Sequence, residues 1–332
     1  MSRSETSAVR SCSRPRAVLV VLLFGASARA HDVSDELTVG ALASNQSRGS
    51  EPYLSDRLGV AGDASDTVTL SVDGTFTRYF KEKKLPAENI YQLAAAVDWE
   101  ASEHVALGLD GRVSPPSTAV TRATSGAGAS TADVLVRSRT SLLAAEASAE
   151  YDTAGDGPTE SILDGALSLA SYSTTQTARR AAAPAIRTKA TPSALAQWRA
   201  SVGFTEVLHD DTEAELSGSY YLYSTDPTGT GYFGASVFGR ESVSDGLPLE
   251  PLRFAVRPAV RQRFGVVKLS AFFQYGRYVD SEGWNALAGV KSQVKVGADW
   301  KLWLAVNVQR DALASSEILW IPWGSVGARL AF

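Results

Sequence analysis

From residue 67 to the C-terminus, apolar and polar residues alternate along the chain with a period of two. In residues 68–76, apolar residues and glycine occupy the even positions, while threonine, serine and aspartate occupy the odd ones. The same alternation recurs in residues 91–100, 213–222 and 253–264. Successive side chains of an extended strand point to opposite faces. No long stretch shows the 3.6-residue period of an amphipathic helix, so the pattern predicts strands with one apolar and one polar face.

Short and long connections alternate between the predicted strands. The longer ones fall near residues 81–88, 115–131, 175–193 and 225–250. The pattern predicts about twelve strands, at residues 67–80, 89–100, 104–114, 132–151, 159–174, 194–208, 212–224, 251–264, 266–279, 285–298, 302–310 and 318–332. An even number of such strands, with short turns at one end and long loops at the other, is typical of a transmembrane β-barrel. We therefore expect an all-β fold: an antiparallel up-and-down barrel with short periplasmic turns and long extracellular loops.

Aromatic residues gather near both ends of the predicted strands. Those beside the short turns are Trp99, Tyr151, Phe264, Trp300 and Phe332. Those toward the long loops are Phe80, Tyr172, Tyr220, Phe254 and Trp320. Aromatic rings favour the two lipid–water interfaces, so two girdles of this kind are expected of a membrane barrel.

The last seven residues form an alternating segment that ends on Phe332. This ending resembles the final strand of bacterial outer-membrane proteins. The resemblance implies that Phe332 is an assembly signal read by the barrel-assembly machinery. It also implies that outer-membrane lipid surrounds the barrel, in a Gram-negative bacterium. It indicates an architecture and no particular family.

The N-terminal segment has the features of a secretory signal peptide. Residues 1–16 carry four arginines and one acid, Glu5, and the apolar run 17–24 follows them. Small residues at Ala28 and Ala30 form an A-x-A cleavage site. The apolar run is about half of the ~20 residues that a membrane-spanning helix needs. We therefore predict a signal peptide over residues 1–30, cleaved after Ala30.

Residues 31–65 are polar, with many serines and glycines and no sustained period. They are predicted to form a flexible periplasmic lead-in, followed by the barrel over residues 66–332. A soluble secreted β-sandwich is the alternative, since its strands also alternate. The polar face of a sandwich meets bulk water and carries dense mixed charge. Here many residues of that face are serine, threonine, alanine and glutamine, which favours a barrel lumen.

Composition is consistent with a barrel and excludes several other classes. Of 332 residues, 44% are hydrophobic. That is too little for a bundle of membrane helices, but it suffices where only alternate residues face lipid. The single cysteine, Cys12, lies in the predicted signal, so the mature chain has neither a disulfide nor a cysteine-based zinc site. Cleavage removes five arginines and one glutamate, so the formal net charge falls from -4 to -8. An acidic chain is a poor candidate for binding nucleic acid.

Candidate chemistry is sparse. The three histidines are His31, His104 and His209, and none has a serine or aspartate at recognisable nucleophile spacing. His104 and His209 flank short turns and are predicted to be simple turn residues at the periplasmic end. His31 would become the N-terminus, where it could bind a metal ion weakly, but no second ligand is identifiable. No G-x-S-x-G, phosphate loop or dinucleotide motif occurs. We therefore predict no enzyme activity, no cofactor and no metal.

Charge on the predicted lumen face is the informative feature. The basic wall comprises Arg253, Arg257, Arg261, Arg263, Lys268, Lys291, Lys295 and Arg329. The acidic wall comprises Asp98, Asp110, Glu146, Glu150, Asp164, Glu213 and Glu215. Opposed walls of this kind produce a transverse field, which orients small polar solutes, and a basic wall favours anions.

These features predict a passive channel for small polar or anionic solutes. Two structural questions stay open: whether the inward arginines merely pair with Glu213 and Glu215, and whether residues 225–250 fold inward or form an ordinary exposed loop. If the pairs fill the lumen, the alternative is a closed structural barrel whose loops bind a partner. A more distant alternative is an outer-membrane hydrolase, which would need a cluster of serine or aspartate with histidine at the outer rim.

Overall fold

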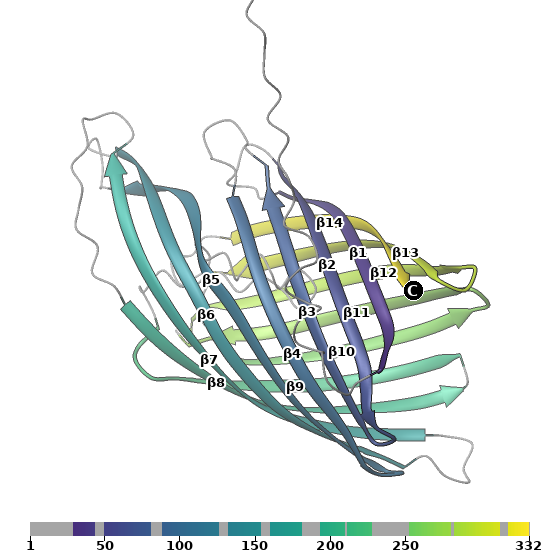
Figure 1. Ribbon diagram of the computed structural model, residues 1–332. Coiled ribbons are helices and arrows are strands. Elements are labelled where there is room, and N and C mark those ends of the chain that lie inside the picture. The colour runs from purple at the N-terminus through teal and green to yellow at the C-terminus, as the bar shows by residue number, and fades with distance from the viewer. Residues whose placement is uncertain are drawn as a thin grey trace, which may run out of the picture.

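The computed structural model describes residues 29–43, 50–80, 88–125, 132–153, 160–180, 193–209, 211–227, 252–279, 282–312 and 318–331. These residues form a closed barrel in which every strand pairs antiparallel with its sequence neighbours (Figure 1). The strands are β1 (Arg29–Ala43), β2 (Ser50–Ser65), β3 (Val68–Tyr79), β4 (Glu88–Ser102), β5 (Val105–Ser125), β6 (Ala132–Asp152), β7 (Glu160–Arg180), β8 (Ser193–His209), β9 (Thr212–Tyr223), β10 (Leu252–Phe264), β11 (Val267–Tyr278), β12 (Trp284–Val296), β13 (Trp300–Ala312) and β14 (Ile318–Ala331).

Pairing between the first and last strands closes the barrel. β1 pairs with β14 from Ser34↔Ala331 to Leu42↔Trp323, and with β2 on its other side. Each strand of the ring therefore has two hydrogen-bonded neighbours, and no edge is left to pair with another chain. The described segments contain no helix long and apolar enough to cross a membrane.

The two faces of the barrel wall differ as the alternation predicts. On β13, Leu302, Leu304 and Val306 are about half exposed on the outer face. Trp303 and Asn307, at the alternate positions of the same strand, belong to the inner face, where Asn307 is buried. An outer surface of exposed leucine, valine and aromatic side chains suits contact with lipid.

The described strands number fourteen, so the expectation of about twelve was too low. The two additional strands are β1 and β2, which occupy the residues predicted to form a flexible lead-in. Their outer face is less apolar than that of the other strands, because Asp35 and Asp56 share it with Leu37 and Leu58. The acids interrupt the apolar row, which hid the period in the sequence. The predicted cleavage site stays a prediction; Ala28 lies outside the described residues, and Ala30 is the second residue of β1.

The other predicted strands match the structure closely, except in length. β5 and β7 continue beyond the predicted ends at residues 114 and 174. Pro115 and Pro116 follow the predicted end at residue 114, and proline cannot donate a backbone hydrogen bond to a ladder. The structure accommodates them in a bulge, where the β5–β6 register shifts between Ser114 and Ser117.

The two ends of the barrel differ in how their strands are connected. Short turns at residues 66–67, 103–104, 265–266 and 297–299 lie at the same end as Arg29 and Ala331; we call it the short-turn end. The opposite end, which carries the longer connections, is the long-connection end. Of the loop predicted over residues 225–250, only residues 225–227 are described.

Burial inside the barrel concentrates at the long-connection end. An apolar cluster there lies on the inner faces of β2, β3, β4, β12 and β14. It comprises Tyr53, Tyr79, Ile90, Leu287, Ile321 and Trp323. The buried polar residues Asn285, Gln309 and Asp311 lie nearby on β12 and β13. Inner-face residues near the short-turn end, such as Lys295, are exposed. The lumen wall is therefore packed at one end and open to solvent at the other.

Candidate functional site

The predicted basic residues lie on one arc of the barrel, from β10 to β14. The ladder places Arg257, Arg261 and Arg263 on the inner face of β10, and Lys268 on that of β11. Lys291 and Lys295 follow on β12, and Arg329 on β14. Arg253 is different, because it lies where the β10–β11 register shifts between Leu252 and Phe254. A bulged residue has no face fixed by alternation, so its inward direction does not follow from the pattern.

The predicted acidic residues lie on the remaining arc, from β4 to β9. Their registers place them all on the inner face: Asp98 on β4, Asp110 on β5, Glu146 and Glu150 on β6, Asp164 on β7, and Glu213 and Glu215 on β9. The arc also holds two cations that sequence reasoning left out, Arg112 and Arg199. Both follow the alternation of their strands, so that signal was present in the sequence.

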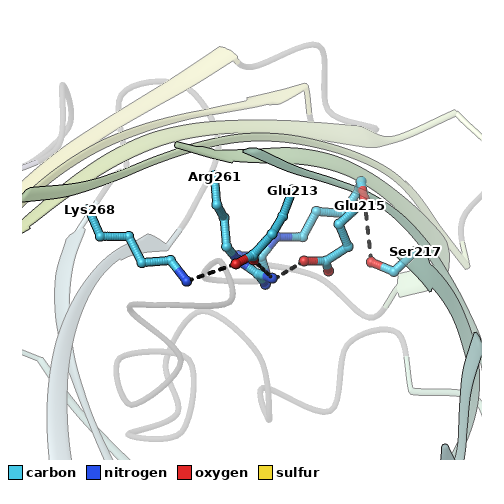
Figure 2. Close-up of polar contacts among 6 residues, drawn as sticks. Glu213, Glu215, Ser217, Arg261 and Lys268 are labelled. Atoms are coloured by element: carbon cyan, nitrogen blue, oxygen red, sulfur yellow. Dashed lines mark hydrogen bonds and ion pairs between the residues drawn. The ribbon is translucent and has the colours of Figure 1, made fainter. Parts of the chain in front are cut away.

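An ion network joins the two arcs where β9 meets β10. Nη1 of Arg261 lies 3.1 Å from Oε2 of Glu213, and Nη2 of Arg261 lies 2.5 Å from Oε2 of Glu215. Lys268 lies 3.2 Å from the other oxygen of Glu213. Figure 2 shows these four side chains projecting from the wall into the barrel. The predicted pairing of inward arginine with Glu213 and Glu215 is therefore present at Arg261.

Two further ion pairs brace the rest of the wall. Arg199 on β8 reaches across β7 to Glu146 on β6. Arg57 on β2 donates two hydrogen bonds to Asp73 on β3, at 3.0 and 3.1 Å. The alternation in residues 68–76 puts Asp73 on the polar face of its strand, but its partner Arg57 was missed because β2 was not recognised as a strand.

Three inner-face aromatic rings lie flat against the wall, each directly opposite a glycine. The pairs are Tyr53 with Gly40, Phe272 with Gly289 and Trp303 with Gly327. A Cβ at Gly327 would lie only 2.0 Å from the Trp303 ring, and one at Gly289 only 2.4 Å from the Phe272 ring. The absence of a side chain at these positions lets each ring cover the backbone of the next strand.

Cations of the basic wall lie over two of these rings. The Arg257 guanidinium carbon is 4.1 Å from the centroid of Phe272, and the Lys291 Nζ is 5.3 Å from that of Trp303. Such contacts are favourable because the ring face carries partial negative charge. Glycine, ring and cation thus form layers from the wall toward the lumen.

A buried carboxylate at the long-connection end was also missed. The Tyr278 hydroxyl donates to Asp311, and Gln309 Nε2 donates to its other oxygen at 2.6 Å. Asp311 and Gln309 are fully buried on β13. Donation from two side chains stabilises a carboxylate that has left bulk water.

The histidines do not assemble a reactive site among the described residues. His104 lies in the turn between β4 and β5, 3.4 Å from an oxygen of Glu103. His209 is the last residue of β8, and His31 belongs to β1. Within the described part of the chain, no group of three or more histidine, cysteine, aspartate or glutamate residues could hold a metal ion.

Most of the predicted aromatic girdle residues lie on the outer face. Trp99, Tyr151 and Trp300 are about half exposed beside the short turns. Tyr172 was placed wrongly, because its hydroxyl donates to Gln197 on the inner face, at 3.1 Å. The predicted assembly signal, Phe332, lies outside the described residues.

Comparison with known proteins identifies the fold. No protein-family model and no curated protein sequence matches the chain. The structure of the CymD monoaromatic hydrocarbon channel aligns with a TM-score of 0.53 at 10% identity, covering 92% of this chain and 89% of that one. The translocator domain of the autotransporter NalP from Neisseria meningitidis aligns with a TM-score of 0.48 at 10% identity, covering 90% of this chain and 87% of that one. Pseudomonas aeruginosa OccK2 (OpdF) in complex with glucuronate aligns with a TM-score of 0.45 at 9% identity, covering 92% of this chain and 100% of that one.

Of these three alignments, the one with CymD exceeds a TM-score of 0.5 and carries the comparison. At 10% identity it concerns the fold and not the solute. The chain therefore has the fold of outer-membrane β-barrel proteins.

Proposed function

We propose that this protein is an outer-membrane β-barrel that passes small polar or anionic solutes passively. The segregation of inner-face charge is the observation that carries the proposal. Cations occupy the arc from β10 to β14, and acids dominate the arc from β4 to β9. Opposed charge across a lumen orients a dipolar solute and lowers the energy of an anion along the basic side.

Exposure of the cations supports a role in conduction. Arg263, Lys291, Lys295 and Arg329 are exposed on the inner face, although the barrel surrounds them. A charge in contact with lumen water acts on a passing ion, whereas a charge buried in an ion pair is largely cancelled. The mechanism requires only diffusion through a charged passage, with no covalent step and no cofactor.

The apolar outer surface and the likeness to CymD support the membrane location. CymD is described as a monoaromatic hydrocarbon channel. The likeness favours a channel over a soluble β-sandwich, while the charged lumen favours polar solutes for this chain. A location in a Gram-negative outer membrane, reached with the predicted signal peptide and with Phe332 as the assembly signal, is part of the proposal.

A closed structural barrel, whose loops bind a partner, is the second candidate function. One observation favours it: inner-face residues at the long-connection end are buried, including Leu287 and Gln309 with no exposed surface. Side chains packed against one another at that end narrow the path that a solute could take through the lumen. Conductance separates the two candidates, because a closed barrel passes no current.

Ion selectivity in planar bilayers tests the channel. We expect the unmodified protein to conduct and to prefer chloride over potassium across a KCl gradient. The double variant Lys291→Glu/Arg257→Glu should lose most of that preference, because it reverses two lumen charges. Arg261 is less suitable for this test, since a glutamate there would lie beside Glu213 and Glu215 and break the network.

Arg78→Glu is the matched control, because Arg78 is exposed on β3 and alternates with inner-face residues such as Thr77. Its selectivity should equal that of the unmodified protein. An unmodified protein that carries no current would overturn the channel proposal and favour the closed barrel. An equal loss of selectivity in Arg78→Glu would mean that overall charge, and not the lumen wall, sets the preference.

A further inference from the structure

A hollow of about 600 Å³ opens at the short-turn end, on the inner side of β10–β13. The turns at residues 265–266 and 297–299 bound it, and Gln293 contributes an amide. Its four charged lining residues are all cations: Arg263, Lys268, Lys295 and Lys301. We call this hollow the rim pocket. Lys301 was not predicted to line the lumen, because the predicted strand began one residue after it.

The acids near the rim pocket do not balance its charge. Glu213 contacts Lys268, but it is shared with Arg261. Asp211 and Asp299 lie in neighbouring turns, and neither lines the pocket. Arg263, Lys295 and Lys301 are exposed. A net positive charge of several units therefore faces one small space.

The strand register places these cations directly opposite one another. Arg263 is paired with Lys268 across β10 and β11, and Lys295 with Lys301 across β12 and β13. Lys301 is in turn opposite Arg329 on β14, whose other neighbour in the ladder is the acid Glu36 on β1. Side chains at paired positions have Cβ atoms about 5 Å apart, and like charges there destabilise the sheet. Like charges are thus placed opposite one another three times on adjacent strands. Such repeated departures from favourable cross-strand pairing are typical of a functional site.

We propose that the rim pocket binds a small soluble anion with at least two negative charges. A single anion of this kind can contact both like-charged pairs and relieve their repulsion. Lysine ammonium, arginine guanidinium and the Gln293 amide supply several donors, and phosphate or carboxylate oxygens accept charge-assisted hydrogen bonds well. The role in transport rests on the proposed function, as a capture or release site at the short-turn mouth. Binding itself requires no conductance.

Calorimetric titration of the detergent-solubilised barrel with inorganic pyrophosphate, at low salt, tests binding. We expect the unmodified protein to bind pyrophosphate, and Lys295→Gln/Lys301→Gln to bind it about tenfold or more weakly. The control Arg78→Gln/Arg112→Gln removes two positive charges away from the pocket. It should bind about as well as the unmodified protein. Equal binding by the pocket variant, or an equal loss in the control, would overturn the proposal.

Thermal unfolding gives a second readout, which a purely structural role would not produce. Without anion, Lys301→Gln should unfold at a higher temperature than the unmodified protein, because the variant removes two like-charge contacts. Pyrophosphate should raise the unfolding temperature of the unmodified barrel and have much less effect on Lys295→Gln/Lys301→Gln. A lower unfolding temperature for Lys301→Gln, with no protection by pyrophosphate, would contradict the proposal.

The two proposals fail in different ways. If the barrel carries no current but still binds pyrophosphate in the pocket, the channel is wrong and the anion site stands. If it conducts but pyrophosphate neither binds nor blocks from either side of the bilayer, the anion site is wrong and the channel stands. If pyrophosphate blocks the current from one side of the bilayer only, and the variant Lys295→Gln/Lys301→Gln is not blocked, the result would support both the channel and the anion site.

Discussion

The smallest unit that shapes the lumen is a glycine opposite an aromatic residue. Gly289 and Gly327 give Phe272 and Trp303 room to lie flat on the wall. Arg257 and Lys291 then lie over the ring faces, toward the lumen. A ring that stood away from the wall would occupy the passage and remove the support for its cation. These glycines are thus required by a close approach and not by backbone conformation.

Gly327→Ala is expected to displace the Trp303 ring. The new methyl would overlap the ring, so the side chain must turn away from the wall. We expect a loss of about 1–3 kcal/mol in stability, which is the usual cost of overpacking. A lower thermal unfolding temperature and a smaller single-channel conductance would show both effects.

The control for this change is Gly111→Ala on β5, where an added Cβ meets nothing within 4 Å. It should unfold and conduct as the unmodified protein does. If Gly327→Ala behaved like Gly111→Ala in both measurements, the ring would not depend on the glycine, and the layered arrangement would need another explanation.

At the scale of the element, the first two strands are decisive for closure. β14 pairs with β13 on one side and β1 on the other, and β2 joins β1 to β3. Without β1 and β2, β3 and β14 would each present an unpaired edge. Backbone groups at such an edge have no partners, and lipid supplies none.

Deletion of residues 31–65 tests the role of β1 and β2. It keeps the predicted signal and removes nearly all of both strands. We expect the truncated chain to form no compact barrel when refolded in detergent, as judged by heat-dependent gel migration and protease resistance. Refolding in detergent separates this result from any defect in export. A truncated chain as resistant as the full one would show that twelve strands suffice for closure.

At the scale of the whole molecule, two gradients define the lumen. Across the barrel, a basic arc faces an acidic one; along it, the lumen wall changes from buried at the long-connection end to exposed at the short-turn end. In the proposed channel, the first gradient selects solutes by charge and the second restricts their passage by size.

Selectivity should depend strongly on salt if the charged wall sets it. The screening length falls from about 30 Å at 0.01 M to about 3 Å at 1 M ionic strength. Reversal potentials at a fixed concentration ratio should therefore show a chloride preference that weakens as both solutions are made more concentrated. Flux of an uncharged sugar serves as the control and should stay constant. If salt does not change the chloride preference, the preference would come from direct contact of the ion with one narrow site and not from the electrostatic field of the lumen wall.

The alternation predicted most of the strands to within a few residues, because strand periodicity is a local property. It failed where polar residues interrupt the outer face, at Asp35 and Asp56. It also failed at Pro115 and Pro116, where the structure continues the strand through a bulge. Alternation placed Lys291 and Glu146 on the inner face, but it cannot orient Arg253, which lies at a register shift.

The sequence alone determined which side chains share a face, since successive residues of an extended chain point in opposite directions whatever their neighbours are. The tertiary structure decided which residues meet across that face. It brought β1 to β14 from opposite ends of the chain, Arg199 to Glu146 across an intervening strand, and Lys295 opposite Lys301. Register and closure are fixed together by hydrogen bonds around the whole ring, so no single strand contains that information. The rim pocket has its positive lining because the strand register sets these cations opposite one another.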